Sequence, residues 1–351
     1  MMHYILSMEL DRKTKWALSI KDKGVLEILD YGKIKVNTLS ESIFDVFSII
    51  YKRYGHNLLE HVKVILLSIP DVASLFQPLK QSVQELYSSI KEEITFFNKE
   101  QIDLLFIHRD GNFYTYEEII SKIDSSEDIE IVDTYWVAPS IVASKYANST
   151  DYIYLDMGSS TTSIIPVKDK RPLVDADENR LFSYKLICFG TEDTPLISVV
   201  NRIRRDKYKE FIPYIYSPVY MNDLFNIDHL IDKLRKKEMT LDELSKEQFL
   251  SLFKLSIFIG QFPFNVNLNL LSNFIKEVKK EIDKMITKYL SKIIKTYAFK
   301  DPIFVIGGDG KNLIFKLLIQ HFSKNKIKKI PYGSEFSAIA LAIHYNSLNI
   351  K

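Results

Sequence analysis

The chain has 351 residues, of which 46% are hydrophobic and 26% charged, as in a globular protein large enough for two domains. Its formal net charge of +2 gives no overall basic field and argues against a nucleic-acid partner, and a single cysteine excludes an intramolecular disulfide. No apolar run approaches the length of a transmembrane helix, and the short apolar N-terminus lacks the basic lead of a signal sequence. We therefore expect a cytoplasmic protein without a membrane partner, with Cys188 buried in its apolar run.

The first third of the chain alternates predicted strands and helices, which is typical of an α/β domain. Strands are expected over residues 2–7, 16–20, 25–34, 62–69, 104–107 and 129–132. The turn Lys21–Gly24 is expected to join the second and third of these strands as a hairpin. Helices are expected around residues 43–50 and 79–97.

The remainder begins with a short helix over 138–147, with Pro139 in its first turn, and continues into a strand–turn–strand over 152–167. One further strand is expected over residues 182–189. A mostly helical region follows, with helices expected over residues 195–203, 229–237, 241–259 and 264–297. The end returns to α/β, with strands expected over residues 302–306 and 327–331 and helices over 311–322 and 333–345. A turn over residues 307–310 joins the first strand to the first helix.

The turn inside residues 152–167 is the most informative motif. It consists of Gly158, Ser159, Ser160, Thr161 and Thr162, and it follows the carboxylate Asp156 at the end of an apolar strand. Glycine lets a main chain approach a ligand closely, and successive N–H groups in such a turn form an anion-binding concavity. The hydroxyls add donors, and Asp156 is suited to hold Mg²⁺ or a water beside the anion. We predict phosphate or diphosphate binding; the alternative is a plain structural hairpin, which usually needs fewer small residues.

A second turn, near the C-terminus, carries three glycines, Gly307, Gly308 and Gly310, between a strand and a helix. Glycines at the carboxyl end of a strand in an α/β sheet are typical of a phosphate-binding position. They either admit a ligand or only satisfy positive φ angles, and the sequence leaves both interpretations open. Asp309, between them, is expected to cap the following helix.

The two turns, one Asp-x-Gly-Ser-x-Thr-Thr and one Ile-Gly-Gly-Asp-Gly, resemble the second phosphate loop and the adenosine loop of the actin-like ATPase superfamily of sugar kinases, Hsp70 and actin. The resemblance implies an α/β fold of two ribonuclease-H-like (actin-like) domains flanking an interdomain cleft, with a helical insertion in the second domain. It implies a first domain of residues 1–132 plus 333–351, and a second domain of 133–332 with a helical region at about 195–298. It also implies Mg²⁺ and ATP or another nucleotide as ligands.

A narrower resemblance covers roughly residues 130–200. The run Leu155–Val167 is similar to the Asp-Ile-Gly-Ser/Gly-Thr-Thr-Thr-Asp-Ile-Ile-Pro motif of the hydantoinase A/oxoprolinase-like family. Within it, the chain resembles the tetrahydromethanopterin-linked one-carbon pathway branch, whose members follow this loop with Arg-Leu, a glycine-containing strand and Arg-Thr-Pro. The corresponding runs are 179–181, 186–190 and 193–196. That branch includes a methanofuran-biosynthesis condensing enzyme, which implies joining a furanylmethyl diphosphate to the amine of a glutamyl-tyramine.

The chain departs from the superfamily at the first phosphate loop, near the N-terminus. That loop normally reads Gly-x-Asp-x-Gly-Gly, whereas residues 7–15 contain no glycine, so a main-chain cradle is sterically hindered there. The residues expected to line this part of the cleft are charged instead: Glu9, Asp11, Arg12, Lys13 and Lys15.

Two further departures concern charge. The carboxylate that ends the family's phosphate loop is Ser163 here, and the arginine of Arg-Thr-Pro is Asp193. A serine is a weaker base and metal ligand than a carboxylate, and the second change reverses the charge. We therefore expect the fold to carry over fully and the chemistry only in part.

Three functions follow from the motifs and the resemblance. The first is a transferase that binds a phosphate or diphosphate ligand in one-carbon cofactor metabolism, with Asp156 as catalytic residue and Mg²⁺ ligand. The second is a catalytically impaired, nucleotide-binding regulatory or assembly protein. The third is an ATP-dependent cyclic amide hydrolase. The expected partner is a small phosphorylated ligand, and the sequence leaves a homodimer open.

Overall fold

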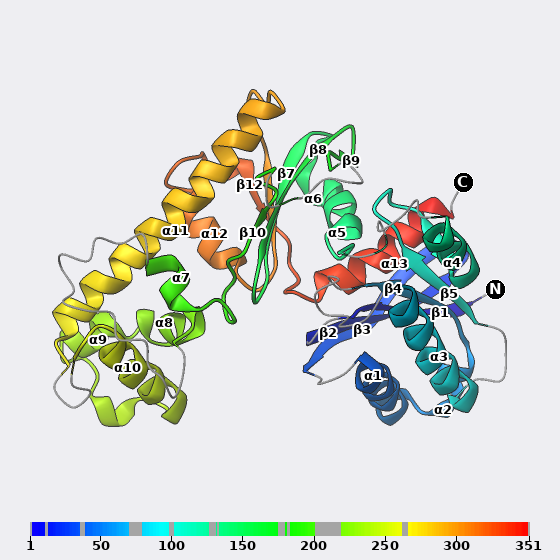
Figure 1. The fold of residues 1–351 in the computed structure, drawn as a ribbon, viewed down its shortest axis with the longest axis horizontal. Helices are drawn as coiled ribbons and strands as arrows, with labels where there is room; N and C mark the ends of the chain where they lie inside the picture. The colour runs from blue at the N-terminus through cyan, green and yellow to red at the C-terminus, as the bar shows by residue number, and fades with distance from the viewer. Residues whose placement is uncertain are drawn as a thin grey trace.

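The computed structural model describes residues 2–10, 13–35, 39–69, 79–97, 102–125, 131, 133–174, 180, 183–200, 219–261 and 266–349. Within these residues, two six-stranded sheets with helices packed against them form two α/β halves, which lie beside each other in Figure 1. None of the described helices is long and apolar enough to cross a membrane.

The first sheet has the strand order β3-β2-β1-β4-β5-β6. Its strands are β1 (His3–Glu9), β2 (Lys13–Asp22), β3 (Val25–Lys35), β4 (Val62–Ser68), β5 (Asp103–Ile107) and β6 (Phe113–Thr115). β1 pairs antiparallel with β2 and parallel with β4, and β4 pairs parallel with β5. The hairpin between β2 and β3 is as predicted: Lys23 (φ 48°) and Gly24 (φ 83°) both take the left-handed conformation of a two-residue hairpin turn.

Both faces of the first sheet are covered because side chains alternate along each strand. Leu6 and Met8 of β1 join the core beneath α1 (Leu39–Tyr54) and α3 (Leu79–Phe97). Ile5, on the other face of β1, joins the core formed with α5 and α13. The shorter helices of this half are α2 (His56–Glu60) and α4 (Tyr116–Asp124).

The second sheet has the order β10-β8-β7-β11-β12, with β9 paired to β8. Its strands are β7 (Tyr152–Met157), β8 (Thr162–Lys168), β9 (Arg171–Pro172), β10 (Leu186–Ile187), β11 (Phe304–Gly307) and β12 (Ile327–Lys329). β7 and β8 are antiparallel, whereas β7 and β11 are parallel, with Asp156 opposite Gly307. The carboxyl ends of β7 and β11 therefore meet at one edge of this sheet.

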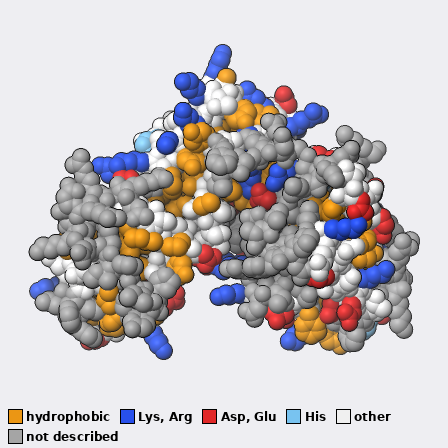
Figure 2. Space-filling model, in the orientation of Figure 1, with side chains coloured by type: hydrophobic (Ala, Val, Ile, Leu, Met, Phe, Trp, Pro, Cys, Tyr) orange, Lys and Arg blue, Asp and Glu red, His pale blue; other side chains and the backbone are white. Residues whose placement is uncertain are grey.

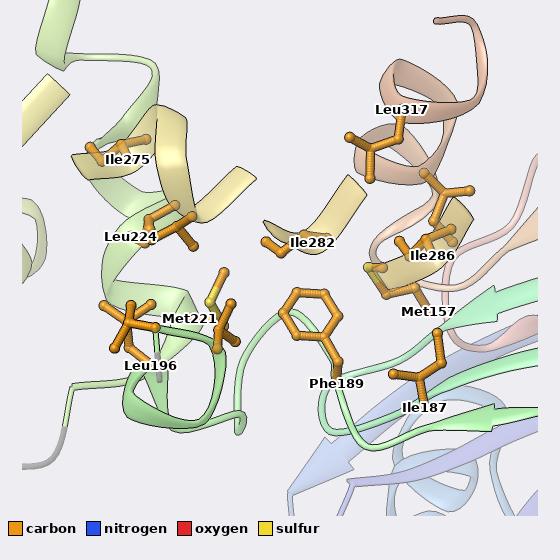
Figure 3. Close-up of a cluster of buried hydrophobic side chains, with 14 of the residues drawn as sticks. Met157, Ile187, Phe189, Leu196, Met221, Leu224, Ile275, Ile282, Ile286 and Leu317 are labelled. Carbon is orange, nitrogen blue, oxygen red and sulfur yellow. The ribbon is translucent and has the colours of Figure 1, made fainter. Parts of the chain in front are cut away.

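A helical region extends the second half away from its sheet (Figure 1). Its elements are α7 (Leu196–Val200), α8 (Met221–Asp228), α9 (Ile231–Arg235), a 3₁₀ turn (Leu241–Glu243), α10 (Lys246–Phe258) and α11 (Leu268–Thr296). The apolar stripe of α11 runs through one continuous core that reaches from the sheet to these helices. Figure 3 shows Ile282 beside Phe189 at the centre of this core, with Leu224 and Ile275 on the helical side and Met157 and Ile286 on the sheet side.

Two short helices, α5 (Val137–Val142) and α6 (Ser144–Ala147), connect the halves, and α13 (Phe336–Leu348) returns the chain to the first sheet. α12 (Lys311–Leu318) and a 3₁₀ turn (Lys324–Lys326) lie between β11 and β12. α13 is buried on nearly all sides because small residues let it approach its neighbours, and the Ser7 hydroxyl donates to the Ala338 carbonyl at 2.7 Å.

The predicted fold class is confirmed: the chain has a two-domain actin-like α/β fold with helices added to the second half. The residue boundaries of the domains stay a prediction. Several local predictions differ. The helix expected over 138–147 is two helices separated at Ala143, and the one over 241–259 begins at Lys246. Of the strand expected over 182–189, the described part, 183–189, forms a strand at Leu186–Ile187 alone. Most of the strand expected over 129–132 lies outside the described residues.

Two single-residue predictions were wrong. Cys188 is exposed and not buried, because only the neighbouring Ile187 and Phe189 point into the core. Asp309 does not cap α12. The N-cap of α12 is Gly310, and the Asp309 carboxylate instead accepts a hydrogen bond from the Ser334 N–H at 3.2 Å.

Candidate functional site

The β7–β8 connection is a four-residue loop, Gly158–Thr161, closed by a hydrogen bond from the Gly158 N–H to the Thr161 carbonyl at 2.9 Å. The next three N–H groups, those of Ser159, Ser160 and Thr161, have no hydrogen-bond acceptor within the described part of the chain. Consecutive N–H groups without an internal acceptor form the kind of concavity that binds an anion. A Cβ on Gly158 would meet only the Thr161 carbonyl, at 3.7 Å, so this glycine leaves the mouth of the loop open.

The loop is fixed from behind by residues for which the sequence predicted no contact with it. Its carbonyls accept hydrogen bonds from the segment 191–193: Gly158 from the Thr191 N–H at 3.0 Å, and Ser159 from the Glu192 and Asp193 N–H groups at 2.9 Å each. Gly190 makes this approach possible, because a Cβ there would lie 2.4 Å from the Ser159–Ser160 peptide. The Gly158 and Ser159 carbonyls are thus turned toward 191–193, and the N–H groups of Ser159, Ser160 and Thr161 are left for another partner.

The second glycine turn lies directly against this loop. The Gly310 N–H donates to the Met157 carbonyl at 3.0 Å. A Cβ on Gly308, which has φ +77°, would lie 2.3 Å from Asp156 Oδ1, and a Cβ on Gly310 would lie 2.3 Å from Met157 Sδ. Both glycines are therefore required for the packing of the two turns, which supports the structural interpretation of these positions. Direct ligand contacts at Gly307, Gly308 and Gly310 stay a prediction.

Asp156 lies at the junction of the two turns and is only partly exposed. Tyr154, two residues earlier on the same face of β7, donates its hydroxyl to Asp156 Oδ2 at 2.8 Å. Burial raises the pKa of the Asp156 carboxyl, and the charge of Asp309 adds to this, while the Tyr154 hydrogen bond and the Lys15 ammonium oppose it. A cation bound nearby would stabilise the ionised form of this carboxyl group.

Cations reach this place from the first sheet. Lys15 is close enough to act on the pKa of Asp156, and it is itself paired with Glu9, the last residue of β1. Lys33 of β3 binds Asp309 at 3.1 Å. Burial opposes ionisation of Asp309, but Lys33 and the Ser334 N–H outweigh it and hold the pKa of Asp309 below its ordinary value. The carboxyl ends of β1 and β7 therefore face each other, and Figure 2 shows a notch between the two halves.

Lys13, the first residue of β2, forms an ion pair with Glu192 and lies 3.9 Å from Asp193. Since the N–H groups of Glu192 and Asp193 also hold the Ser159 carbonyl, this pair links the first sheet to the anion loop. Of the predicted first-loop residues, the structure therefore brings Glu9, Lys13 and Lys15 to the interface of the halves. Asp11 and Arg12 lie outside the described residues.

Arg180 supports the other side of the loop. Its guanidinium makes a bidentate pair with Asp133, donates to the Ser163 hydroxyl at 3.2 Å and stacks over Tyr135 and Trp136. The Tyr135 hydroxyl lies 3.1 Å from that of Ser163 and 3.4 Å from that of Thr161. Arg180 is 3% exposed, so it fixes the loop base and does not reach solvent. Arg180 belongs to the run 179–181 that matches the Arg-Leu of the resembling branch, but nothing in the sequence indicated its contacts with Asp133 and Tyr135.

The five predicted loop residues are not equivalent. Ser159 and Ser160 have no hydrogen-bond partner for their hydroxyls among the described residues, where the Thr161 hydroxyl has one, the Tyr135 hydroxyl. Thr162 is fully buried, and its hydroxyl donates to the Phe189 carbonyl at 2.6 Å. Thr162 therefore holds β8 to the segment before Gly190, and its side chain is not available to a ligand.

The donor set suits Mg²⁺. Among the described residues no group of three His, Cys, Asp or Glu side chains gathers to hold a metal ion. Mg²⁺, however, is usually held through one or two carboxylates, substrate phosphates and waters, and a single partly exposed carboxylate beside an anion loop fits that requirement. Asp156 is the residue that would hold it.

These features define the class of protein: an actin-like α/β protein with a loop of unsatisfied N–H groups and a carboxylate at the interface of its two halves. Among solved structures, the chain is similar to acetone carboxylase in its nucleotide-free form, from work on ATP-dependent acetone carboxylation. The TM-score is 0.60 at 9% identity, over 97% of this chain and 70% of that chain. The chain also overlaps the ethanolamine utilization protein EutJ from Carboxydothermus hydrogenoformans, over 97% of this chain and 89% of that one, at 12% identity and a TM-score of 0.45.

No known protein-family model matches the chain. A curated relative is (4-{4-[2-(gamma-L-glutamylamino)ethyl]phenoxymethyl}furan-2-yl)methanamine synthase from Methanocaldococcus jannaschii, 25% identical over 193 residues. The match covers 54% of this chain and 52% of the relative, so the chain spans about half the length of the relative it matches. The name of that relative corrects one expectation: a phenoxymethyl group is an ether, so its product joins the furanylmethyl unit to a phenol oxygen and not to the amine of the glutamyl-tyramine unit.

Proposed function

We propose that the Gly158–Thr161 loop binds the phosphate or diphosphate group of a small ligand at the interface of the two halves. The observation that carries this proposal is the row of three N–H groups, Ser159 to Thr161, without an acceptor in the described chain, while the carbonyls of Gly158 and Ser159 are bonded to segment 191–193. A plain structural hairpin has no need for this one-sided arrangement.

The charged residues around the loop fit the same ligand. Lys15 is near Asp156, and Lys33 is near the adjoining turn, so cations from the first sheet face the N–H groups of the second. Mg²⁺ held by Asp156 would neutralise charge on a diphosphate. The raised pKa of Asp156 means that this carboxylate is stabilised when a cation binds beside it.

We further propose that the reaction is a transfer in which a diphosphate leaves a carbon atom of one substrate. The C–O bond to the diphosphate breaks, a nucleophilic atom of the second substrate bonds to that carbon, and the leaving group takes the bonding electrons. The loop N–H groups and the lysines would stabilise the negative charge that develops on the departing diphosphate. The curated relative, a synthase that makes an ether of a furanylmethyl group, supports this reaction class and a role in methanofuran-type one-carbon cofactor metabolism.

A second function is favoured by the ion pairs between the halves. Lys13 with Glu192, and Lys33 with Asp309, already join the first sheet to the anion loop and to the adjoining turn. A ligand that competes for these lysines would shift one half relative to the other, as in a nucleotide-binding regulatory or assembly protein.

Calorimetric titration with pyrophosphate–Mg²⁺ and with ATP–Mg²⁺ tests the site. We expect Asp156→Ala to weaken Mg²⁺-dependent binding by about tenfold or more, and Asp242→Ala, at an exposed carboxylate on the helical region, to leave it unchanged. Without Mg²⁺, Asp156→Ala should not weaken binding, since the lost carboxylate repels the anion. If neither ligand binds the wild-type protein, the proposal is wrong. Turnover that disappears in Asp156→Ala supports a transferase, and partner assembly that persists supports the second function.

A further inference from the structure

A groove of about 460 Å³ lies in the second half, between the amino-terminal part of α11, the end of α8 and the outer face of α12. α11 and α12 run beside each other there (Figure 1). Its volume lies within the range of small-molecule sites in proteins. None of the loop residues assigned to phosphate binding lines it.

The walls of the groove are strongly basic. Lys276 and Lys280 lie one turn apart on α11, and Lys316 faces them from α12. These three exposed ammonium groups have no acceptor in the described part of the chain. With Lys279, four lysines line the groove against two carboxylates, so its walls carry an excess of positive charge.

Two carboxylates also line the groove, and both are hydrogen-bonded to other residues. Asp228 accepts two hydrogen bonds from Lys279, both at 2.6 Å. Asp283 accepts from the His321 ring at 2.9 and 3.1 Å. These pairs hold α8 and the end of α12 to α11, and they leave the groove attractive to an anion.

The floor of the groove is apolar. Phe225, Leu313 and Leu317 line it, and Leu317 is 5% exposed. Asn312 also lines the groove, and its side-chain carbonyl oxygen accepts a hydrogen bond from Lys329 at 3.1 Å. A bare inorganic anion would bury none of this apolar surface, whereas an aromatic or aliphatic body would gain about 25 cal/mol for each Å² that it covers.

We propose that this groove is a second binding site, for an organic anion: a carboxylate or phosphate carried on a flat apolar body. The acidic group lies between Lys280 and Lys316, and the apolar body lies against Phe225 and Leu313. Since Gly310 is the N-cap of α12, a ligand here contacts the helix that continues directly from the glycine turn beside the anion loop.

The test uses the full chain and the fluorescent probe 1-anilinonaphthalene-8-sulfonate, an apolar-bodied anion. We expect one saturable site, with an affinity about tenfold lower in Lys280→Gln/Lys316→Gln and lower at high salt. The matched control is Lys284→Gln/Lys288→Gln, two exposed lysines further along α11 that do not line the groove, and it should bind as the wild type does. Equal melting temperatures of the variants show that folding is intact.

Competition separates this site from the loop. Phenyl phosphate and benzoate should displace the probe, and the better competitor identifies the acidic group. Pyrophosphate, which has no apolar body, should not displace it. Displacement by pyrophosphate, an unchanged affinity in the double variant, or the absence of saturable binding would each overturn the proposal, and none of these results bears on pyrophosphate binding at the loop.

Discussion

The two strand ends that face each other at the interface of the halves are built on different principles. The end of β7 is surrounded by small residues, and its shape is set by main-chain contacts: the Gly158–Thr161 loop, Gly190 behind it and Gly308 beside it. The end of β1 is surrounded by long charged side chains, and its contacts are ion pairs made by Lys13 and Lys15 of β2 and Lys33 of β3. The end of β7, the geometric side, is thus shaped by main-chain packing, and the end of β1, the charged side, is held by ion pairs.

This difference shows how the chain can keep an anion site without the glycines of a first phosphate loop. A main-chain cradle offers directed N–H donors and needs close packing, whereas lysines offer charge at a distance and need little geometry. The two sides should therefore respond differently to mutation, to pH and to salt.

The largest expected effect concerns the geometric side. Gly308→Ala combines a positive φ with a Cβ 2.3 Å from Asp156 Oδ1 and 2.4 Å from the Met157 carbonyl, so it should destabilise the fold by about 3 kcal/mol or more. Gly24→Ala is the control, because Gly24 has φ +83° with nothing within 4 Å of its Cβ, and it should cost about 1–2 kcal/mol. Urea unfolding measures both. Equal losses would mean that the two turns do not depend on close packing.

The next effect is that ionisation of one carboxylate destabilises the fold, whereas ionisation of another stabilises it. The folded-state pKa of Asp156 is raised, so its ionisation costs stability as the pH rises through that pKa, whereas the pKa of Asp309 is lowered, and its contribution is lost as the pH falls through that pKa. At pH 7 without metal, Asp156→Asn should be more stable than the wild type, and Asp309→Asn less stable.

The stability differences of Asp156→Asn and Asp309→Asn from the wild type should both shrink as the pH falls through the range in which carboxyl groups ordinarily titrate. Thermal melting from about pH 3 to about pH 8 measures them, because this interval contains the ordinary carboxyl pKa values. If both variants were more stable than the wild type at pH 7, or both less stable, the opposite pKa shifts assigned to Asp156 and Asp309 would be contradicted. Mg²⁺ should restore part of the wild-type stability at pH 7 and leave Asp156→Asn unchanged.

The smallest effect concerns the charged side. Lys33→Gln removes a partly exposed ion pair with Asp309, and such pairs contribute about 1 kcal/mol or less. The loss should disappear at high salt, in contrast to that of Gly308→Ala. Lys23→Gln, at an exposed turn with no ion pair among the described residues, is the matched control. If the loss of stability in Lys33→Gln persisted at high salt, the contribution of Lys33 would come from packing and not from charge.

Much of the fold was predictable from local signals. The hairpin at Lys23–Gly24, the apolar strands β4, β7 and β11, and the long helix before Tyr297 all follow from residue patterns that act over a few positions. Errors arose where the pattern was ambiguous over a short run, as for Cys188 between two core residues, or where a partner far along the chain decided the outcome, as for Asp309.

For the candidate site, the sequence by itself determined the loop, because five small residues after a strand and a carboxylate have a direct chemical meaning. The tertiary structure alone decided which of those residues face a ligand: Thr162 is bound to Phe189, Gly308 packs on Asp156, and the loop carbonyls are bonded to residues 191–193. The physical reason is that hydrogen-bond satisfaction is a property of the whole packed chain. A sequence shows which donors exist, and only the folded structure shows which of them remain without an acceptor.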